Sequence, residues 1–207
     1  MGTNALTNPE YPNLRTHEAP PLLRKIYQFM YSDKGRGCGL ELPSERYSSS
    51  KQKVADFVGP ELAEAIIPIF QLGHGSLIGV WLREPDGNLE NSPVVWLDSE
   101  GDPTEVFANS LAELCGMLHY YDGTVYDIIK SAMRHLERPQ MFGHPMERFP
   151  TQELQEKVNK FWDRNPQLQH LHEFLEGELG IPMDLAIPAT ILAALGNHPR
   201  LSKLVVF

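Results

Sequence analysis

The sequence predicts an α+β fold with a mainly antiparallel sheet, a meander around residues 77–107, and helices packed around it. Two observations lead to this prediction. Residues 77–83 and 93–98 are β-branched and aromatic runs joined by a polar loop with an Asp-Gly turn signal, which is typical of a β-hairpin. Before and after them, apolar residues recur at the spacing of helices. The length of 207 residues fits one such domain with a helical C-terminal region.

Alternation along the two hairpin strands predicts how their side chains divide between the faces of the sheet. Both faces contain apolar residues. A third short strand at 104–107 is expected to continue the meander after the turn at 98–102. One face is expected to carry Ile78, Val80, Leu82, Val95 and Leu97, and the other Trp81, Val94 and Trp96.

Periodicity and cap signals place the other elements of the first two thirds of the chain. Residues 1–17 are rich in Asn, Pro and Thr and are predicted to form a flexible arm. A helix is predicted at 22–30, whereas 54–69 indicates mixed helix and turn because prolines interrupt it. Ser110 is expected to cap one helix in a capping box, and Thr124 to cap the next.

The last third of the chain is predicted to be mostly helical. Thr151 is expected to cap one helix and Pro166 to start another, followed by a short helix at 189–195 and a strand at 204–207. The predicted organisation is an arm at 1–17, an α+β domain at 18–138, and a helical extension at 139–207 packed on the same domain.

Charge and cysteine content restrict the possible functions. The chain has 27 acidic and 18 basic residues and a formal net charge of -9, which disfavours direct nucleic-acid binding and favours a basic protein partner. Cys38 and Cys115 lie outside any Cys-x-x-Cys spacing, so neither a disulfide framework nor a thiolate zinc site is expected. Because no signal peptide or membrane-spanning segment is recognisable, we expect a cytoplasmic protein that does not enter a membrane.

The glycine-rich stretch GHGSLIGVW at 73–81 matches no catalytic or phosphate-binding motif. Its glycines are spaced one residue too far apart for G-x-G-x-x-G, and Ser76 is not in a G-x-S-x-G arrangement. It precedes a strand rather than a helix, so we predict a turn into a strand. His170 and His172 are two residues apart on a predicted helix and do not face one another, so no metal site is expected.

Three pieces of the chain form an ordered pattern. They are PIFQLGHGSLIGVW, which enters a strand; SPVVWLDSEG, a second strand with an acidic-glycine turn; and VFANSLAELCGML, which starts a helix. In this order the span 68–118, about a quarter of the 207 residues, resembles the SUKH superfamily of immunity and cell-wall-assembly-regulator-like domains. The resemblance implies that residues 18–138 form an α+β domain of that kind.

The resemblance also implies a binding protein that needs no cofactor and is not an enzyme. Bacterial members are typically immunity proteins that neutralise a cognate polymorphic toxin, often a nuclease or deaminase, and other members are regulatory interaction scaffolds. We therefore expect this protein to block the active surface of a basic toxin. A regulatory scaffold of the same superfamily and an unrecognised hydrolase are the alternatives.

The acidic turns of the hairpin and its tryptophans are the expected interaction surface, because acids attract a basic partner and tryptophan anchors many binding hot spots. The alternative for the tryptophans is core packing under the protein's own helices, and for the acids a solvated loop. The candidate residues are Glu84, Asp86 and Glu90 in the hairpin loop, Trp81 and Trp96 in the strands, and Asp98, Glu100 and Asp102 in the following turn.

Overall fold

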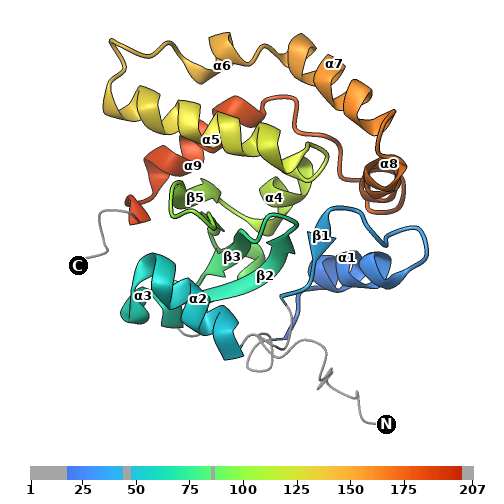
Figure 1. The fold of residues 1–207 in the computed structure, drawn as a ribbon, viewed down its shortest axis with the longest axis horizontal. Coiled ribbons are helices and arrows are strands. Elements are labelled where there is room, and N and C mark those ends of the chain that lie inside the picture. The colour runs from blue at the N-terminus through green and yellow to red at the C-terminus, as the bar shows by residue number, and fades with distance from the viewer. Residues whose placement is uncertain (1–17, 44–47, 85–86, 202–207) are drawn as a thin grey trace.

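The fold is a five-stranded antiparallel sheet with helices on both faces (Figure 1). The computed structural model describes residues 18–43, 48–84 and 87–201. In these residues each strand pairs with the next strand along the chain. The predicted α+β class with a mainly antiparallel sheet is therefore confirmed. The strands are β1 (Leu40–Glu41), β2 (Ile66–Leu72), β3 (Leu77–Trp81), β4 (Val94–Leu97) and β5 (Thr104–Ala108).

Helices precede, interrupt and follow the sheet. In the part of the chain that the structure describes, one lies before β1, two lie between β1 and β2, and the others follow β5; a short 3-10 turn, η2, lies between β3 and β4. The helices are α1 (Pro21–Tyr31), α2 (Ser48–Val58), α3 (Pro60–Glu64), α4 (Leu111–Met117), α5 (Asp122–Glu137), α6 (Pro145–Arg148), α7 (Thr151–Trp162), α8 (Pro166–Glu173) with the π-helical turn η3 (Phe174–Glu178), and α9 (Ile187–Asn197); η2 is Leu89–Asn91.

Strand β2 corrects the expectation of mixed helix and turn at 54–69. The first part of that segment is helical, but the chain from Ile66 onward is an almost fully buried strand. Pro68 is accommodated because the pairing with β3 shifts register between Pro68 and Phe70, and proline is tolerated in a sheet at such irregularities. The longest strand of the described sheet was therefore not predicted, because Pro68 interrupts its apolar run.

The pairing of β3 with β4 also differs from the prediction. Ile78 lies opposite Trp96, and Val80 lies opposite Val94. Residues directly opposite one another in a sheet share a face, so the predicted grouping of Ile78 and Val80 with Val95 is wrong. The alternation within each strand was predicted correctly, but an offset of one residue between the strands exchanges the faces.

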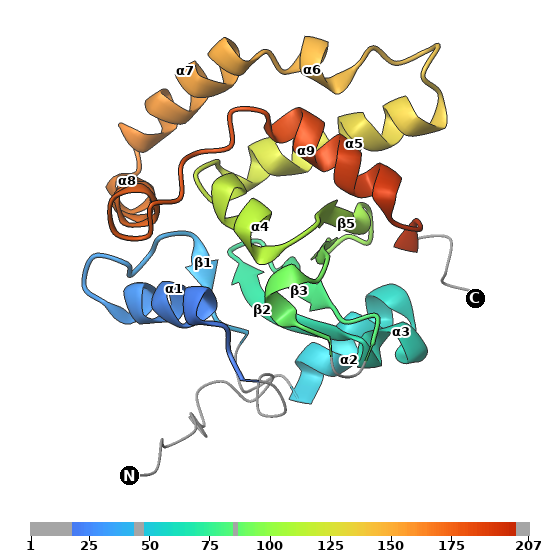
Figure 2. The ribbon, with the colours of Figure 1, turned by 180° about the vertical axis from the view of Figure 1, so that it is seen from behind.

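Helices bury both faces of the sheet. Figures 1 and 2 show α2 and α3 on one side of the sheet and α4 and α5 on the other. On the first face, Val54 and Val58 of α2 pack with Trp81. The second face, which carries Ile78 and Trp96, is buried by side chains from α1, α4, α5, α8 and α9. The sheet therefore exposes its ends rather than its faces.

Helix α9 joins the C-terminal region to the same core. It packs along α5 and β5 (Figure 2), and Ile187 and Ile191 belong to the cluster on the second face. Beyond α9, the Arg200 Nε donates to Glu105 Oε1 at 2.8 Å and the Leu201 N–H donates to Glu105 Oε2 at 3.0 Å. The last described residues are thus tied to strand β5.

Two of the predicted helix starts agree with the structure and two differ; helix α8 begins at Pro166, as predicted. The Ser110 hydroxyl accepts a backbone N–H from the first turn of α4, which confirms its predicted cap. Helix α5 begins at Asp122, so that Thr124 lies inside the helix, and Thr151 is the first residue of α7 rather than its cap. The predicted arm at 1–17 and strand at 204–207 fall outside the described residues.

Candidate interaction site

The acids predicted as partner contacts occupy opposite ends of strand β4. Glu84 and Glu90 lie on the β3–β4 connection, before β4, whereas Glu100 and Asp102 lie in the β4–β5 turn, after it. Glu90 is half-buried and the other three are exposed. Asp86 lies outside the described residues. The structure therefore presents two separate acidic surfaces instead of one.

The two tryptophans named as possible anchors belong to the core. Trp81 is 7% exposed and Trp96 is 1% exposed. The Trp96 ring meets Phe107 edge to face, with ring centroids 5.8 Å apart. Neither ring is an exposed anchor, so the core alternative describes both residues in this structure. Trp96 still contributes to the wall of a pocket described below.

Asp98 is buried and orders the β4–β5 turn rather than facing outward. Its carboxylate accepts hydrogen bonds from the Ser76 hydroxyl at 3.3 Å, the Trp96 indole N–H at 3.5 Å and the Glu100 backbone N–H at 2.9 Å. A buried carboxylate needs such partners to offset its lost hydration. Asp98 is therefore corrected from a partner contact to a residue that shapes the turn.

Three segments meet at this end of the sheet through His74 and Ser76. Ser76, at the end of the β2–β3 turn, accepts the backbone N–H of Ser99 from the β4–β5 turn at 2.9 Å. The His74 Nδ1 lies 3.0 Å from Ser76 Oγ, and its Nε2 lies 3.2 Å from an oxygen of Asp122. Asp122 is the first residue of α5, where the helix dipole favours a carboxylate. We call the group formed by Glu100, Asp102, Asp122 and His74 the acidic end.

The acidic end combines negative charge with aromatic surface. The Lys130 ammonium lies 3.6 Å from Asp102, but the Asp102 side chain remains 69% exposed, so water screens the pair strongly. The Tyr126 hydroxyl donates to the Asp102 carbonyl oxygen at 3.3 Å. Tyr121, which directly precedes Asp122, is 47% exposed. Tyrosine is enriched at protein interfaces relative to the rest of the surface.

The contacts from Ser76 through His74 to Asp122 follow the order of a catalytic triad but do not provide a nucleophile. Ser76 has no exposed surface, and its oxygen already accepts the Ser99 N–H. A nucleophilic hydroxyl must reach a substrate atom. These hydrogen bonds therefore hold the turns together and do not activate Ser76 as a nucleophile.

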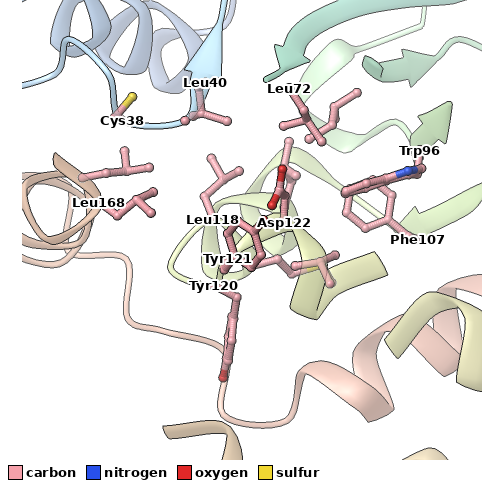
Figure 3. Close-up of a pocket in the computed structure, with 16 residues that line it drawn as sticks. Cys38, Leu40, Leu72, Trp96, Phe107, Leu118, Tyr120, Tyr121, Asp122 and Leu168 are labelled. Carbon is pink, nitrogen blue, oxygen red and sulfur yellow. The ribbon is translucent and has the colours of Figure 1, made fainter. Parts of the chain in front are cut away.

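An apolar pocket of about 90 Å³ adjoins the acidic end (Figure 3). Its walls come from strands β2 to β5, α4, the start of α5, the segment leading into β1, and α8. Trp96, Phe107, Leu118 and Leu168 are among the lining residues. Asp122 is the one charged residue among the described residues of the lining. In Figure 3 its carboxylate lies between the side chains of Leu118 and Trp96.

A histidine pair fixes the position of α8, which forms one wall of this pocket. The Nδ1 atoms of His119 and His172 lie 2.7 Å apart, and the His119 Nε2 lies 3.1 Å from the Ile181 carbonyl oxygen. The His172 ring stacks on Trp162, and its Nε2 lies 3.2 Å from Glu176. Burial, reinforced by the charge of His172, lowers the pKa of His119 to about 4.

Comparison with known proteins identifies no relative, so a function is proposed from the geometry of the acidic end and the pocket. No protein-family model, curated protein or solved structure matches this chain. Within the described ranges, no helix is long and apolar enough to cross a membrane, and no group of three or more His, Cys, Asp or Glu side chains is arranged to hold a metal ion. The resemblance to the SUKH superfamily stays a prediction.

His74 and Asp122 belong to the site but were not predicted as its members. His74 lies in the glycine-rich stretch, for which only a turn was predicted, and Asp122 belongs to no motif. They meet only because the β2–β3 turn folds against the start of α5. The sequence does show an acidic residue at the expected start of a helix, where the helix dipole favours it. This position alone does not predict which turn of the chain lies beside it.

Proposed function

We propose that this protein binds a basic partner protein through the acidic end and neutralises it, as an immunity protein does with a cognate toxin such as a nuclease or deaminase. The observation that carries the proposal is the gathering of Glu100, Asp102 and Asp122 at one end of the sheet, on segments joined by Ser76 and His74. The net charge of -9 adds long-range attraction for a basic protein.

The physical basis is competition for a positively charged surface. Enzymes that act on nucleic acids hold phosphates with Lys and Arg side chains. A matching acidic surface occupies those cations and excludes the substrate. Attraction between opposite charges accelerates association, and salt weakens this acceleration. Carboxylates on turns that are already ordered lose little conformational freedom on binding, which favours affinity.

The proposal predicts that a toxin-like protein is encoded next to the gene for this chain, and it is tested with that protein. We expect the purified chain to bind that protein with nanomolar affinity and its co-expression to restore growth of cells that carry the toxin. The double variant Glu100→Lys/Asp102→Lys should slow association about 10-fold or more at low salt and flatten its salt dependence. Its melting temperature should change little, because both side chains are exposed.

The matched control is Glu84→Lys/Glu90→Lys, which changes the net charge equally at the other end of β4. We expect it to slow association much less. A larger loss in this control than in the first variant would move the interface to the hairpin loop, as the sequence also allowed. No binding of the toxin-like protein by the unmodified chain would contradict the proposed function.

The regulatory alternative predicts binding without inhibition. A scaffold can hold a partner at the same acidic end while leaving its active surface free. Measuring the nuclease or deaminase activity of the partner in the purified complex separates the two functions, because neutralisation requires that this activity is lost.

A further inference from the structure

We infer that the apolar pocket receives a lysine side chain of the partner, with the aliphatic stem between the apolar walls and the ammonium group at Asp122. This inference deepens the proposed function and rests on it for the source of the lysine. The pocket adjoins the acidic end, since Asp122 belongs to both. A partner seated on the acidic end therefore has one of its side chains beside the pocket.

The size and lining of the pocket fit the stem of a lysine. A volume of about 90 Å³ is space for several water-sized groups. It is sufficient to admit the methylene groups of a lysine stem. Leu72, Ile78, Leu118 and Leu168 provide apolar contact for such a chain. Burying methylene groups there is favourable without any polar partner.

Asp122 provides the negative charge that the ammonium group at the end of this stem requires. It is the one charged residue in the described lining, and its side chain is 21% exposed. One carboxylate oxygen accepts the Gly123 N–H at 2.7 Å, and the other lies 3.2 Å from His74 Nε2. A carboxylate has about four acceptor positions, and the contacts of the described residues leave two of them open. A cation placed against the apolar walls offsets the cost of holding this carboxylate there.

The same contacts favour lysine over arginine. An arginine fork binds a carboxylate best when both oxygens are free for two parallel hydrogen bonds. Each oxygen of Asp122 already has one contact, so an arginine fork would have to share both oxygens with Gly123 and His74. An ammonium group is a compact point charge that needs only one open position. Trp96 and Tyr121 also line the pocket, and aromatic rings attract a nearby ammonium group.

The inference is tested on the full chain without a partner, with n-butylammonium as a probe of the lysine side chain and n-butanol as its uncharged equivalent. Binding is followed by NMR through the Trp96 indole N–H, identified by its loss in Trp96→Phe, and through the amide of Gly123. We expect saturable shifts of both signals, with a millimolar dissociation constant for n-butylammonium and binding at least about 5-fold weaker for n-butanol.

Two variants, with one control, distinguish the contribution of the Asp122 charge from that of the pocket volume. Asp122→Asn should weaken n-butylammonium at least about 10-fold while changing n-butanol less than about 2-fold, because it removes only the charge. Asp127→Asn is the matched control, since Asp127 is exposed on the same helix and does not line the pocket; it should leave both probes unchanged. Leu168→Phe narrows the pocket from α8 and should weaken both probes alike.

The inference is overturned if the unmodified chain shows no saturable shift, or if Asp122→Asn binds n-butylammonium as well as the unmodified chain does. Preserved amide spectra of the variants show that they fold. These outcomes are independent of the toxin experiment, because no partner is present. A chain that neutralises its toxin but does not bind the probe refutes the lysine pocket alone, and a chain that binds the probe but no toxin refutes the proposed function alone.

Discussion

Both ends of strand β4 carry acidic turns, but their surroundings differ. At the acidic end, hydrogen bonds between neighbouring turns order the backbone and leave Glu100 and Asp102 exposed. At the opposite end, which we call the covered end, the Arg83 guanidinium contacts His198 Nδ1 and lies 5.0 Å from the centre of the Trp81 ring. The chain's own C-terminal segment therefore contacts this end through Arg83, while Glu84 itself remains exposed.

The difference shows why an acid in a turn is not by itself an interaction site. A nearby cation does not distinguish the two ends, because Arg83 directly precedes Glu84 and Lys130 lies 3.6 Å from Asp102. Burial, and secondarily the charge of Arg83, lowers the pKa of His198, which favours a neutral ring there. A turn is available to a partner only where the chain's own side chains and segments do not already occupy its surface.

The largest expected effect on the two ends comes from removing Glu105, because Glu105 holds the C-terminal segment that contacts the covered end. Glu105→Ala leaves Arg200, whose side chain is 13% exposed, without its closest carboxylate, and leaves the buried Leu201 N–H without its acceptor. Such a loss from a buried pair costs about 3–5 kcal/mol of unfolding free energy. Urea unfolding measures this cost.

Glu137→Ala is the control for Glu105, because Glu137 contacts the same arginine at 3.2 Å with a side chain that is 54% exposed. An exposed ion pair contributes less than about 1 kcal/mol. Equal losses from the two variants would contradict the view that the buried carboxylate anchors the C-terminal segment.

The wall of the pocket beside the acidic end is tested through the histidine pair that positions α8. The pKa of His119 is about 4 in the folded protein against 6.5 for a free histidine, so between these values the unfolded chain binds a proton that the folded chain does not. The contribution of neutral His119 to the unfolding free energy should be fully present above pH 6.5. The unfolding free energy should then fall by about 3 kcal/mol as the pH drops toward 4.

This pH effect is measured by urea unfolding at a series of pH values. The His119→Gln variant should lose most of the slope between pH 6.5 and 4, because it has no group to titrate. His170→Gln should keep the slope, since His170 is not a member of the histidine pair and its Nδ1 lies 3.3 Å from the Lys34 carbonyl oxygen. An unchanged slope in His119→Gln would assign the acid sensitivity to other groups.

The parts of the fold that were predictable from the sequence depend on neighbouring residues in the chain. The turn at 73–76, the strand after it and the cap at Ser110 are local signals, and the structure confirms them. The pairing of Ile78 with Trp96 could not be predicted, because period-two alternation fixes faces within a strand but not the offset between two strands. The contact of His74 with Asp122 is likewise set by packing between distant segments.

The smallest expected effect compares one buried serine at each end of β4. Ser76→Ala removes the acceptor of the Ser99 N–H and a donor to Asp98, which should cost about 1–3 kcal/mol because those groups lose their partners. Ser92→Ala, near the covered end, removes one hydrogen bond to the Asn88 carbonyl oxygen, at 2.7 Å, and should cost about 1 kcal/mol or less.

Partner association distinguishes the two serines further than stability does. Ser76 joins the turns that carry the acids, so Ser76→Ala should slow binding of the toxin-like protein even at temperatures where the variant is fully folded. Ser92→Ala should leave the association rate unchanged, because the segment it orders lies at the other end of the strand. If both variants bind equally fast, the order of the turns at the acidic end does not contribute to recognition, and the exposed charges alone account for it.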